Sequence, residues 1–128
     1  MTSSRLGGTL LTTVALLSVG FATPAGAEIP MSTVTLTIEA PQGGLSRVRL
    51  DCDPPGGSHP DSATACAEIA AAGGDLSQLE EQLVSCTMEL RPVTASARGV
   101  WEGEVVLWQR EYSNPCTMRA ATGSVFDF

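Results

Sequence analysis

The sequence predicts a single α+β domain with an antiparallel sheet of about five strands, two short helices and two disulfides. Three features carry this prediction. Residues 32–39 and 47–52 show the alternation of half-buried strands, and residues 63–72 are rich in alanine, as helices often are. Four cysteines also follow an N-terminal segment that is typical of exported proteins.

Residues 1–27 are expected to be a cleaved signal peptide, which leaves residues 28–128 as the domain. Arg5 is the only charged residue of the segment, residues 9–22 are mostly apolar, and Ala25-Gly26-Ala27 is a small-x-small cleavage sequence. The apolar stretch is too short to span a membrane comfortably, although an uncleaved anchor is the alternative. The protein is therefore expected to be secreted and extracellular.

The chain is acidic, with seven basic residues, all of them Arg, against fourteen acidic residues and a formal net charge of −7. An acidic chain without a basic stripe is a poor candidate for binding nucleic acid or anionic membranes. We expect neither partner for the mature chain. The glycine pairs do not form a phosphate-binding motif, and no cofactor is expected.

The cysteines Cys52, Cys66, Cys86 and Cys116 all follow the signal segment. An even number in a small exported chain indicates two disulfides, and the sequence alone allows three pairings. We favour Cys52–Cys66 and Cys86–Cys116. A zinc site is the alternative, but the chain has no C-x-x-C motif and His59 is its only histidine, so no metal site is expected.

The first half of the chain is expected to contain strands over 32–39 and 47–52, an irregular loop over 53–60 and a helix over 63–72. The two strands could pair as a hairpin. Asp61 or Ser62 would cap the helix, and Gly73-Gly74 would end it. Cys66 and Ile69, three positions apart on the helix, would face the core.

The second half is expected to contain a short helical turn within 75–83, strands over 92–96, 100–101 and 105–112, a short helix over 116–121 and a final strand over 124–128. In the longest strand, Val106, Trp108 and Tyr112 share one face, and Val105 and Leu107 share the other. With apolar residues on both faces, this strand is expected to be central or to meet a partner with one face.

The sequence offers no case for an enzyme. A nucleophilic hydrolase needs a base beside Ser or Cys, and the one candidate of that type is His59, in a Gly/Pro-rich loop with Asp61 nearby. The acid pairs Glu80-Glu81 and Glu102/Glu104 are expected to be solvated surface residues rather than a glycosidase site. A small hydrolase centred on His59 is kept as an alternative.

The candidate site is the segment from Ser85 to Pro92. Its long, flexible and apolar Met88 lies two residues after Cys86 and four before Pro92. A disulfide at Cys86 would tether the segment, and Pro92 fixes its own φ and favours an extended Arg91. A stiff extended loop with an apolar tip could be bound by a protease in the way a substrate is. The alternative is that Met88 is a methionine buried in the core.

Short motifs are spread along residues 32–128: Thr35-Leu36-Thr37, Leu50-x-Cys52, His59-Pro60, Ala65-Cys66-Ala67, Ala72-Gly73-Gly74-Asp75-Leu76, Cys86-Thr87-Met88 with Pro92-Val93, Val100-Trp101-x-Gly103, Tyr112-Ser113-Asn114-x-Cys116 and Gly123-Ser124-Val125-Phe126-x-Phe128. Together they resemble the subtilisin inhibitor-like proteins of Streptomyces. The resemblance implies an extracellular serine protease inhibitor with a five-stranded antiparallel sheet, two helices and a homodimer formed by packed sheets. It also supports the favoured disulfide pairings.

The same resemblance implies roles for individual residues. By position, Met88 is the P1 residue and Met88–Glu89 is the reactive bond. Asn114 and Pro92 are expected to support the loop. Further contacts with a protease are expected from Ser85, Cys86, Thr87, Leu90 and Arg91.

Met88 suits the apolar pockets of subtilisin-like and chymotrypsin-like proteases, and it offers no charge to a trypsin-type pocket. The chain also departs from the family pattern. Glu89 places a charge at P1′, Thr87 stands where Pro is common, and the segments Cys52–Cys66 and Cys66–Cys86 each look one residue shorter. The alternative function is a secreted, disulfide-stabilised binding domain that has kept the scaffold and lost inhibition.

Overall fold

The computed structural model describes residues 7–8, 19–23, 26 and 28–128. Most of the expected signal peptide, residues 1–27, therefore lies outside the described residues. Among the residues that are described, no helix is both long and apolar enough to cross a membrane.

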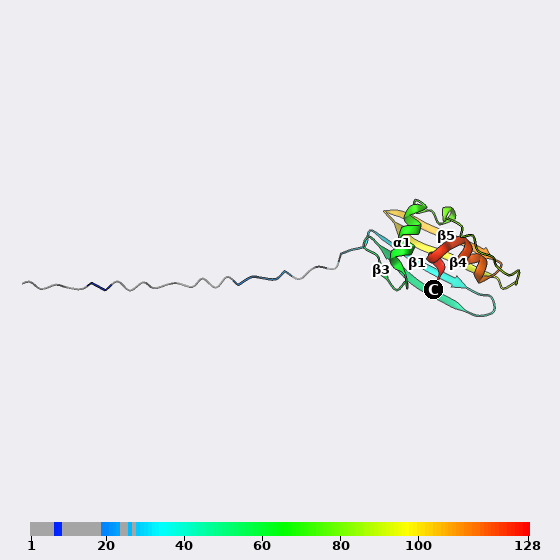
Figure 1. Ribbon diagram of the computed structural model, residues 1–128, viewed down its shortest axis with the longest axis horizontal. Helices are drawn as coiled ribbons and strands as arrows, with labels where there is room; N and C mark the ends of the chain where they lie inside the picture. Colours follow the sequence, from blue (N-terminus) through cyan, green and yellow to red (C-terminus); the bar gives the residue numbers. More distant parts are fainter. Residues whose placement is uncertain (1–6, 9–18, 24–25, 27) are drawn as a thin grey trace, which may run out of the picture.

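A five-stranded antiparallel sheet forms the frame of the domain (Figure 1). The strand order is β3-β2-β1-β4-β5, with β1 in the centre. The strands are β1 (Ser32–Glu39), β2 (Leu45–Cys52), β3 (Gly56–Gly57), β4 (Val93–Trp101) and β5 (Glu104–Tyr112). This arrangement confirms the predicted α+β class and its antiparallel sheet.

Helical segments cover one face of the sheet (Figure 1). They are α1 (Ser62–Ala71), the 3₁₀ helix η1 (Leu76–Gln78), α2 (Pro115–Thr122) and the 3₁₀ helix η2 (Gly123–Phe126). Leu36 of β1, Ile69 of α1 and Phe126 of η2 are fully enclosed between these layers. Their removal from water is the main driving force for covering this face.

Several local predictions are also confirmed. Asp61 rather than Ser62 caps α1, because its carboxylate accepts a hydrogen bond from the backbone N–H of Thr64. Cys66 and Ile69 are buried on the core side of that helix. The disulfides are Cys52–Cys66, which ties β2 to α1, and Cys86–Cys116, and the described residues contain no free cysteine.

The strand predicted over 124–128 is wrong. Residues 123–126 form the 3₁₀ helix η2. Val125 and Phe126 are consecutive, and both are completely buried. A strand lying on the core would bury alternate residues, whereas a helical turn can direct two neighbours inward.

Three other expectations need correction. Residues 92–96 and 100–101 do not form separate strands, because β4 runs without a break from Val93 to Trp101. The loop over 53–60 is not wholly irregular, since Gly56–Gly57 pairs with β2 as β3. Residues 105–112 belong to β5, which lies at the edge of the sheet and not at its centre.

Gly99 explains why β4 can continue where the sequence suggested an interruption. It lies opposite Val34 in the pairing of β1 with β4, with φ at +157°. A Cβ atom at this position would lie 2.1 Å from the carbonyl oxygen of Thr33, well inside van der Waals contact. Only glycine lets the central strand approach so closely.

Replacing Gly99 by Ala is therefore expected to lower the free energy of unfolding by roughly 3 kcal/mol, because the added methyl group must push β1 and β4 apart. Urea unfolding of the purified domain measures this change. The matched control is Gly44→Ala, whose Cβ would meet Ala40 at an ordinary 3.8 Å. Equal unfolding midpoints for the two variants would contradict this account of β4.

Candidate functional site

The predicted site lies on an irregular segment, residues 79–92, that links η1 to β4. Its apolar side chains are unusually exposed. Met88 is 102% exposed, as much as in an unfolded chain, and Leu83 and Leu90 also face solvent. Apolar side chains held out from a folded loop indicate contact with another molecule, and the alternative of a core methionine is wrong.

A disulfide and a backbone hydrogen bond anchor the loop before Met88. Cys86 is bonded to Cys116 in α2, with Cα atoms 5.8 Å apart. Further back, the N–H of Gln82 donates to the carbonyl oxygen of Ala120 over 2.6 Å. The upstream arm of the loop is thus attached to α2 at two places.

Asn114 holds the loop on both sides of Met88. Its Nδ2 atom donates to the carbonyl oxygens of Thr87, at 3.2 Å, and of Glu89, at 2.8 Å. The Asn114 side chain is buried behind the loop. Among the described residues, no hydrogen bond uses the carbonyl oxygen of Met88 itself. The residue at the tip is therefore fixed through its neighbours, while its own carbonyl group stays free.

The Asn114 side chain is itself fixed by α2. Its Oδ1 atom accepts from the backbone N–H of Thr117 at 2.8 Å, and the Thr117 hydroxyl accepts from the backbone N–H of Asn114 at 3.2 Å. This reciprocal pair is a capping box, and Pro115 occupies the first helical position. The helix start thus sets the direction in which the two N–H groups point at the loop.

The downstream arm is held by the same short segment. The backbone N–H of Arg91 donates to the carbonyl oxygen of Ser113 over 2.8 Å, just before β4 begins. Arg91 also lies 3.7 Å from the Glu89 carboxylate, but both side chains are more than half exposed. Water and salt screen such a pair, so it adds little to the rigidity of the loop.

The side chain of Tyr112 lies next to this support and stays uncharged. Burial raises the pKa of the Tyr112 phenol, and the nearby Arg110 guanidinium, 5.3 Å from the ring, opposes this shift. Tyr112 ends β5 immediately before Ser113. The buried ring thus lies directly before the segment that supports the loop.

The structure brings together most of the residues singled out in the sequence. The expected contact residues Ser85, Thr87, Glu89, Leu90 and Arg91 are all exposed, Cys86 and Pro92 are half-buried, and Asn114 is buried beneath them. Sequence reasoning missed Thr117 and Ala120 as parts of the support. An Asn-Pro pair with Thr three residues after Asn is a helix-start signature that could have identified Thr117.

The hydrolase alternative finds no support. His59 is buried, its Nδ1 atom accepts from the N–H of Asp61 at 3.0 Å, and its Nε2 atom donates to the carbonyl oxygen of Val125 at 3.1 Å. Both ring nitrogens are thus occupied by backbone groups, so the ring cannot serve as a base. The carboxylates at 80, 81, 102 and 104 are exposed, and the described residues contain no cluster suited to a metal ion.

Comparisons with known proteins agree with this geometry. Residues 27–114 match the model of the subtilisin inhibitor-like family. A putative serine protease inhibitor of Streptomyces avermitilis is 38% identical over 129 residues, which cover 98% of this chain and 87% of that protein. The transglutaminase-activating metalloprotease inhibitor of Streptomyces mobaraensis is 38% identical over 105 residues, which cover 76% of this chain and 71% of that protein.

A solved structure is similar as well. It is Streptomyces caespitosus sermetstatin in complex with Bacillus licheniformis subtilisin, which matches with a TM-score of 0.62 and 29% identity over 76% of this chain and 98% of that chain. These relatives are protease inhibitors and not enzymes. The findings confirm the resemblance seen in the sequence motifs.

Two substitutions of Asn114 separate its two roles. Asn114→Ala removes the helix cap and both loop hydrogen bonds, and it is expected to lower the free energy of unfolding by about 2–3 kcal/mol. Asn114→Asp keeps the oxygen that caps α2 but loses both N–H donors. The free energy of unfolding should therefore fall by less than in Asn114→Ala, while the loop becomes more mobile. Urea unfolding and hydrogen exchange at the amide of Arg91 measure the two effects.

The control for this pair is Ser113→Ala. This substitution removes a hydroxyl that contacts Thr117 Oγ1 at 3.2 Å, and it leaves the hydrogen bonds to the loop in place. Its Arg91 amide should exchange as slowly as in the unmodified chain. Slow exchange in Asn114→Asp as well would show that the loop does not depend on the Asn114 donors.

Proposed function

Because the chain belongs to the subtilisin inhibitor-like family, we propose that it is a secreted inhibitor of subtilisin-like serine proteases that binds them as a substrate does. Residues 1–27 direct export, and residues 28–128 are the inhibitor domain. Met88 is the P1 residue, and Met88–Glu89 is the reactive bond. The observation that carries this proposal is the fully exposed Met88 between two carbonyl groups that the buried Asn114 holds in place.

The exposed groups of the loop suit the parts of a serine protease site. An extended segment can pair with strand edges in the cleft through its backbone, and the Met88 side chain can fill an apolar S1 pocket. The free carbonyl group of Met88 can then enter the oxyanion hole, whose donors need an acceptor without other partners. Ser85, Cys86 and Thr87 occupy the unprimed side, and Leu90 and Arg91 the primed side.

Rigidity separates an inhibitor from a substrate. A loop that is already ordered loses little entropy on binding, which favours a tight complex. After cleavage, the new end at Met88 stays attached through Cys86–Cys116 and through the Thr87–Asn114 hydrogen bond. The new amine at Glu89 is kept close by the Glu89–Asn114 and Arg91–Ser113 bonds. Religation therefore competes with release of the products.

The charges of the loop limit the choice of protease. Met88 is uncharged and gains nothing from the acidic S1 pocket of a trypsin-type enzyme. Glu89 presents an exposed carboxylate at P1′ with only a weak partner in Arg91. Like charges across an interface are costly, so proteases with an acidic S1′ site are disfavoured.

A homodimer through the outer face of the sheet is the second part of the proposal. This face is opposite the helices, and it carries an apolar corner formed by Val100, Val105 and Leu107, of which the last two are 81% and 74% exposed. The register pairs Val100 with Val105, which makes the corner continuous across β4 and β5. A second copy of the chain would cover it.

Titration of subtilisin with the mature domain tests the inhibitory function. The unmodified domain should abolish protease activity at close to one inhibitor per active site. Met88→Asp places a charge in the S1 pocket and should weaken inhibition at least about a hundredfold. Met31→Asp, an equally drastic change at an exposed methionine on the far end of the sheet, should have no effect.

Chymotrypsin and trypsin are titrated alongside, with inhibition of trypsin not expected. Failure of the unmodified domain to inhibit subtilisin or chymotrypsin would contradict the proposal and favour the binding domain that has lost inhibition. Equal inhibition by the Met88→Asp domain would exclude Met88 as the P1 residue.

Equilibrium sedimentation tests the dimer. The domain is expected to be dimeric at micromolar concentration, and Leu107→Arg should make it monomeric because the charge would have to be buried at the interface. Arg47→Lys, which keeps the charge of the same outer face, should stay dimeric. A monomeric unmodified domain would contradict this part of the proposal.

A further inference from the structure

Met88 is open to chemical modification as well as to a protease. Its side chain is 102% exposed, so water and small solutes reach the sulfur atom freely. A methionine thioether in this position can be oxidised to the sulfoxide, which turns a flexible apolar side chain into a polar one. The residue that is proposed to fill an apolar pocket is therefore also one whose polarity an oxidant can change.

The other methionines differ from Met88 in exposure or in place. The sequence has four, of which Met1 falls in the expected signal peptide. Met118 belongs to the hydrophobic core and is only 1% exposed. Met31 is 68% exposed, but it precedes β1, at the end of the sheet opposite to the reactive loop. Oxidation is therefore expected at Met88 and Met31, and only Met88 lies on the loop.

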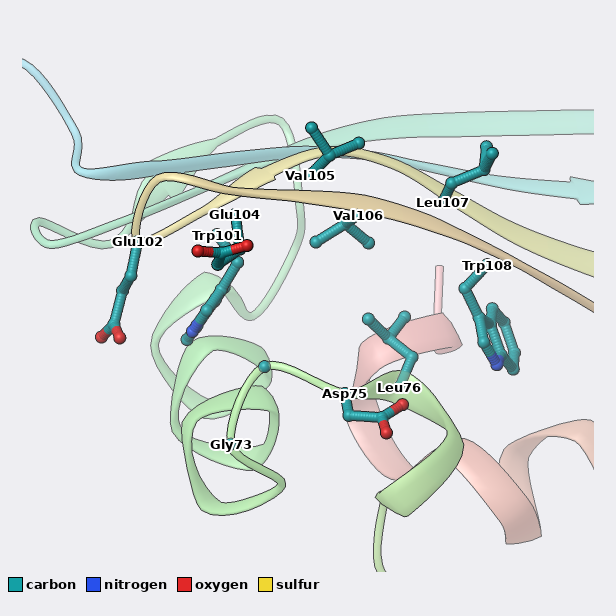
Figure 2. A pocket seen from close by; sticks show the side chains of 11 residues that line it. Gly73, Asp75, Leu76, Trp101, Glu102, Glu104, Val105, Val106, Leu107 and Trp108 are labelled. Atoms are coloured by element: carbon teal, nitrogen blue, oxygen red, sulfur yellow. The ribbon is translucent and has the colours of Figure 1, made fainter.

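Other side chains that oxidants attack are less accessible. The described residues contain no free cysteine, because all four cysteines are joined in disulfides. Figure 2 shows Trp101 and Trp108 pointing from the sheet toward the turn that follows α1, and the first is buried and the second half-buried. A mild oxidant thus reaches the methionine of the loop without a competing thiol.

The shape of the loop does not depend on the Met88 side chain. The loop is held by the disulfide of Cys86 and by the hydrogen bonds from Asn114 to the carbonyl oxygens of Thr87 and Glu89. None of these contacts uses an atom of Met88. An oxygen added to its sulfur would face water in the free domain. Oxidation should therefore leave the fold and the loop unchanged.

The cost of the added oxygen appears when a protease binds. In an apolar S1 pocket, the sulfoxide oxygen would lose its hydrogen bonds to water, and a buried polar group without a partner is costly. The same pocket would keep solvent away from an unmodified Met88. Binding and oxidation therefore oppose each other: the oxidised domain binds weakly, and the bound domain is oxidised slowly.

We propose that Met88 is a site of reversible oxidation, at which a peroxide switches the inhibitor off. This inference rests on the proposed function, since it needs Met88 at the P1 position. The sulfur lone pair attacks one oxygen of hydrogen peroxide, so that an S–O bond forms and the O–O bond breaks. The second oxygen leaves as hydroxide and takes the proton of the new S–OH group to form water. The sulfur loses two electrons, and the peroxide gains them.

The reverse step belongs to methionine sulfoxide reductases, which return the sulfoxide to the thioether. Two thiol groups supply the electrons and become a disulfide, and the oxygen leaves as water. Met88 suits such an enzyme because it protrudes from an irregular segment, residues 79–92. A protease restrained by the unmodified domain would thus become active under oxidising conditions and be restrained again after reduction.

Two variants confine the oxidation to one methionine each. Met31→Leu leaves Met88 as the exposed methionine of the domain, and Met88→Leu leaves Met31. Each mature domain is treated with hydrogen peroxide, desalted and titrated against subtilisin, and peptide mass mapping locates the added oxygen. Oxidation of Met31→Leu should raise its inhibition constant at least about tenfold. For Met88→Leu, the inhibition constants before and after treatment should be equal.

Two further readouts complete the test. Hydrogen exchange at the Arg91 amide, which is bonded to Ser113, should be as slow after oxidation as before, which excludes a loosened loop as the cause. Methionine sulfoxide reductases for both epimers, with thioredoxin as the dithiol, should restore inhibition by the oxidised Met31→Leu domain. Met88→Leu in the same mixture shows whether the reductant opens Cys86–Cys116.

The outcomes separate this inference from the proposed function. If untreated Met31→Leu inhibits subtilisin, the inference is overturned by equal inhibition after oxidation, by the absence of an added oxygen at Met88, or by reductases that fail to restore inhibition. An equal loss in the treated Met88→Leu domain would overturn it too, because the loss would then not come from Met88. If the untreated domain does not inhibit, the proposed function itself fails, and this inference fails with it.

Discussion

The candidate site depends on one buried amide group. Asn114 uses its oxygen to cap α2 and its nitrogen to hold the two carbonyl groups that flank Met88. Because both N–H bonds come from a single planar group, the distance between the two held carbonyls is fixed by the geometry of that group. The loop is therefore positioned by the start of a helix rather than by contacts of its own side chains.

The rest of the fold keeps that helix start in place. Met118 and Thr122 on the inner side of α2 are almost completely buried, and the hydroxyl of Thr122 donates to the carbonyl oxygen of Met118. The disulfide Cys86–Cys116 then joins the first turn of α2 to the loop. The hydrophobic core, the helix and the loop thus form one continuous support, in which rigidity at the tip has its origin in packing beneath the sheet.

Features that depend on local patterns could be predicted from the sequence, whereas features that depend on tertiary contacts could not. Periodic patterns identified β1, β2 and α1, since alternation and helical spacing are local properties. The C-terminal strand was wrong because burial of both Val125 and Phe126 is a tertiary requirement. For the site, Met88, the flanking cysteine and proline, and Asn114 were predicted from local motifs and resemblance. The hydrogen bonds from Gln82 to Ala120 and from Arg91 to Ser113 join backbone atoms, so the pattern of side chains in the sequence does not reveal them.

The central claim is that the loop is cut at one bond and held together across it. The most direct measurement is to incubate the domain with a catalytic amount of subtilisin and follow the products by mass spectrometry and N-terminal sequencing. The account predicts a single new amino terminus at Glu89, two fragments that separate only after reduction of Cys86–Cys116, and a stable mixture of cut and intact inhibitor. Cleavage at another bond, or continued degradation of the domain, would contradict it.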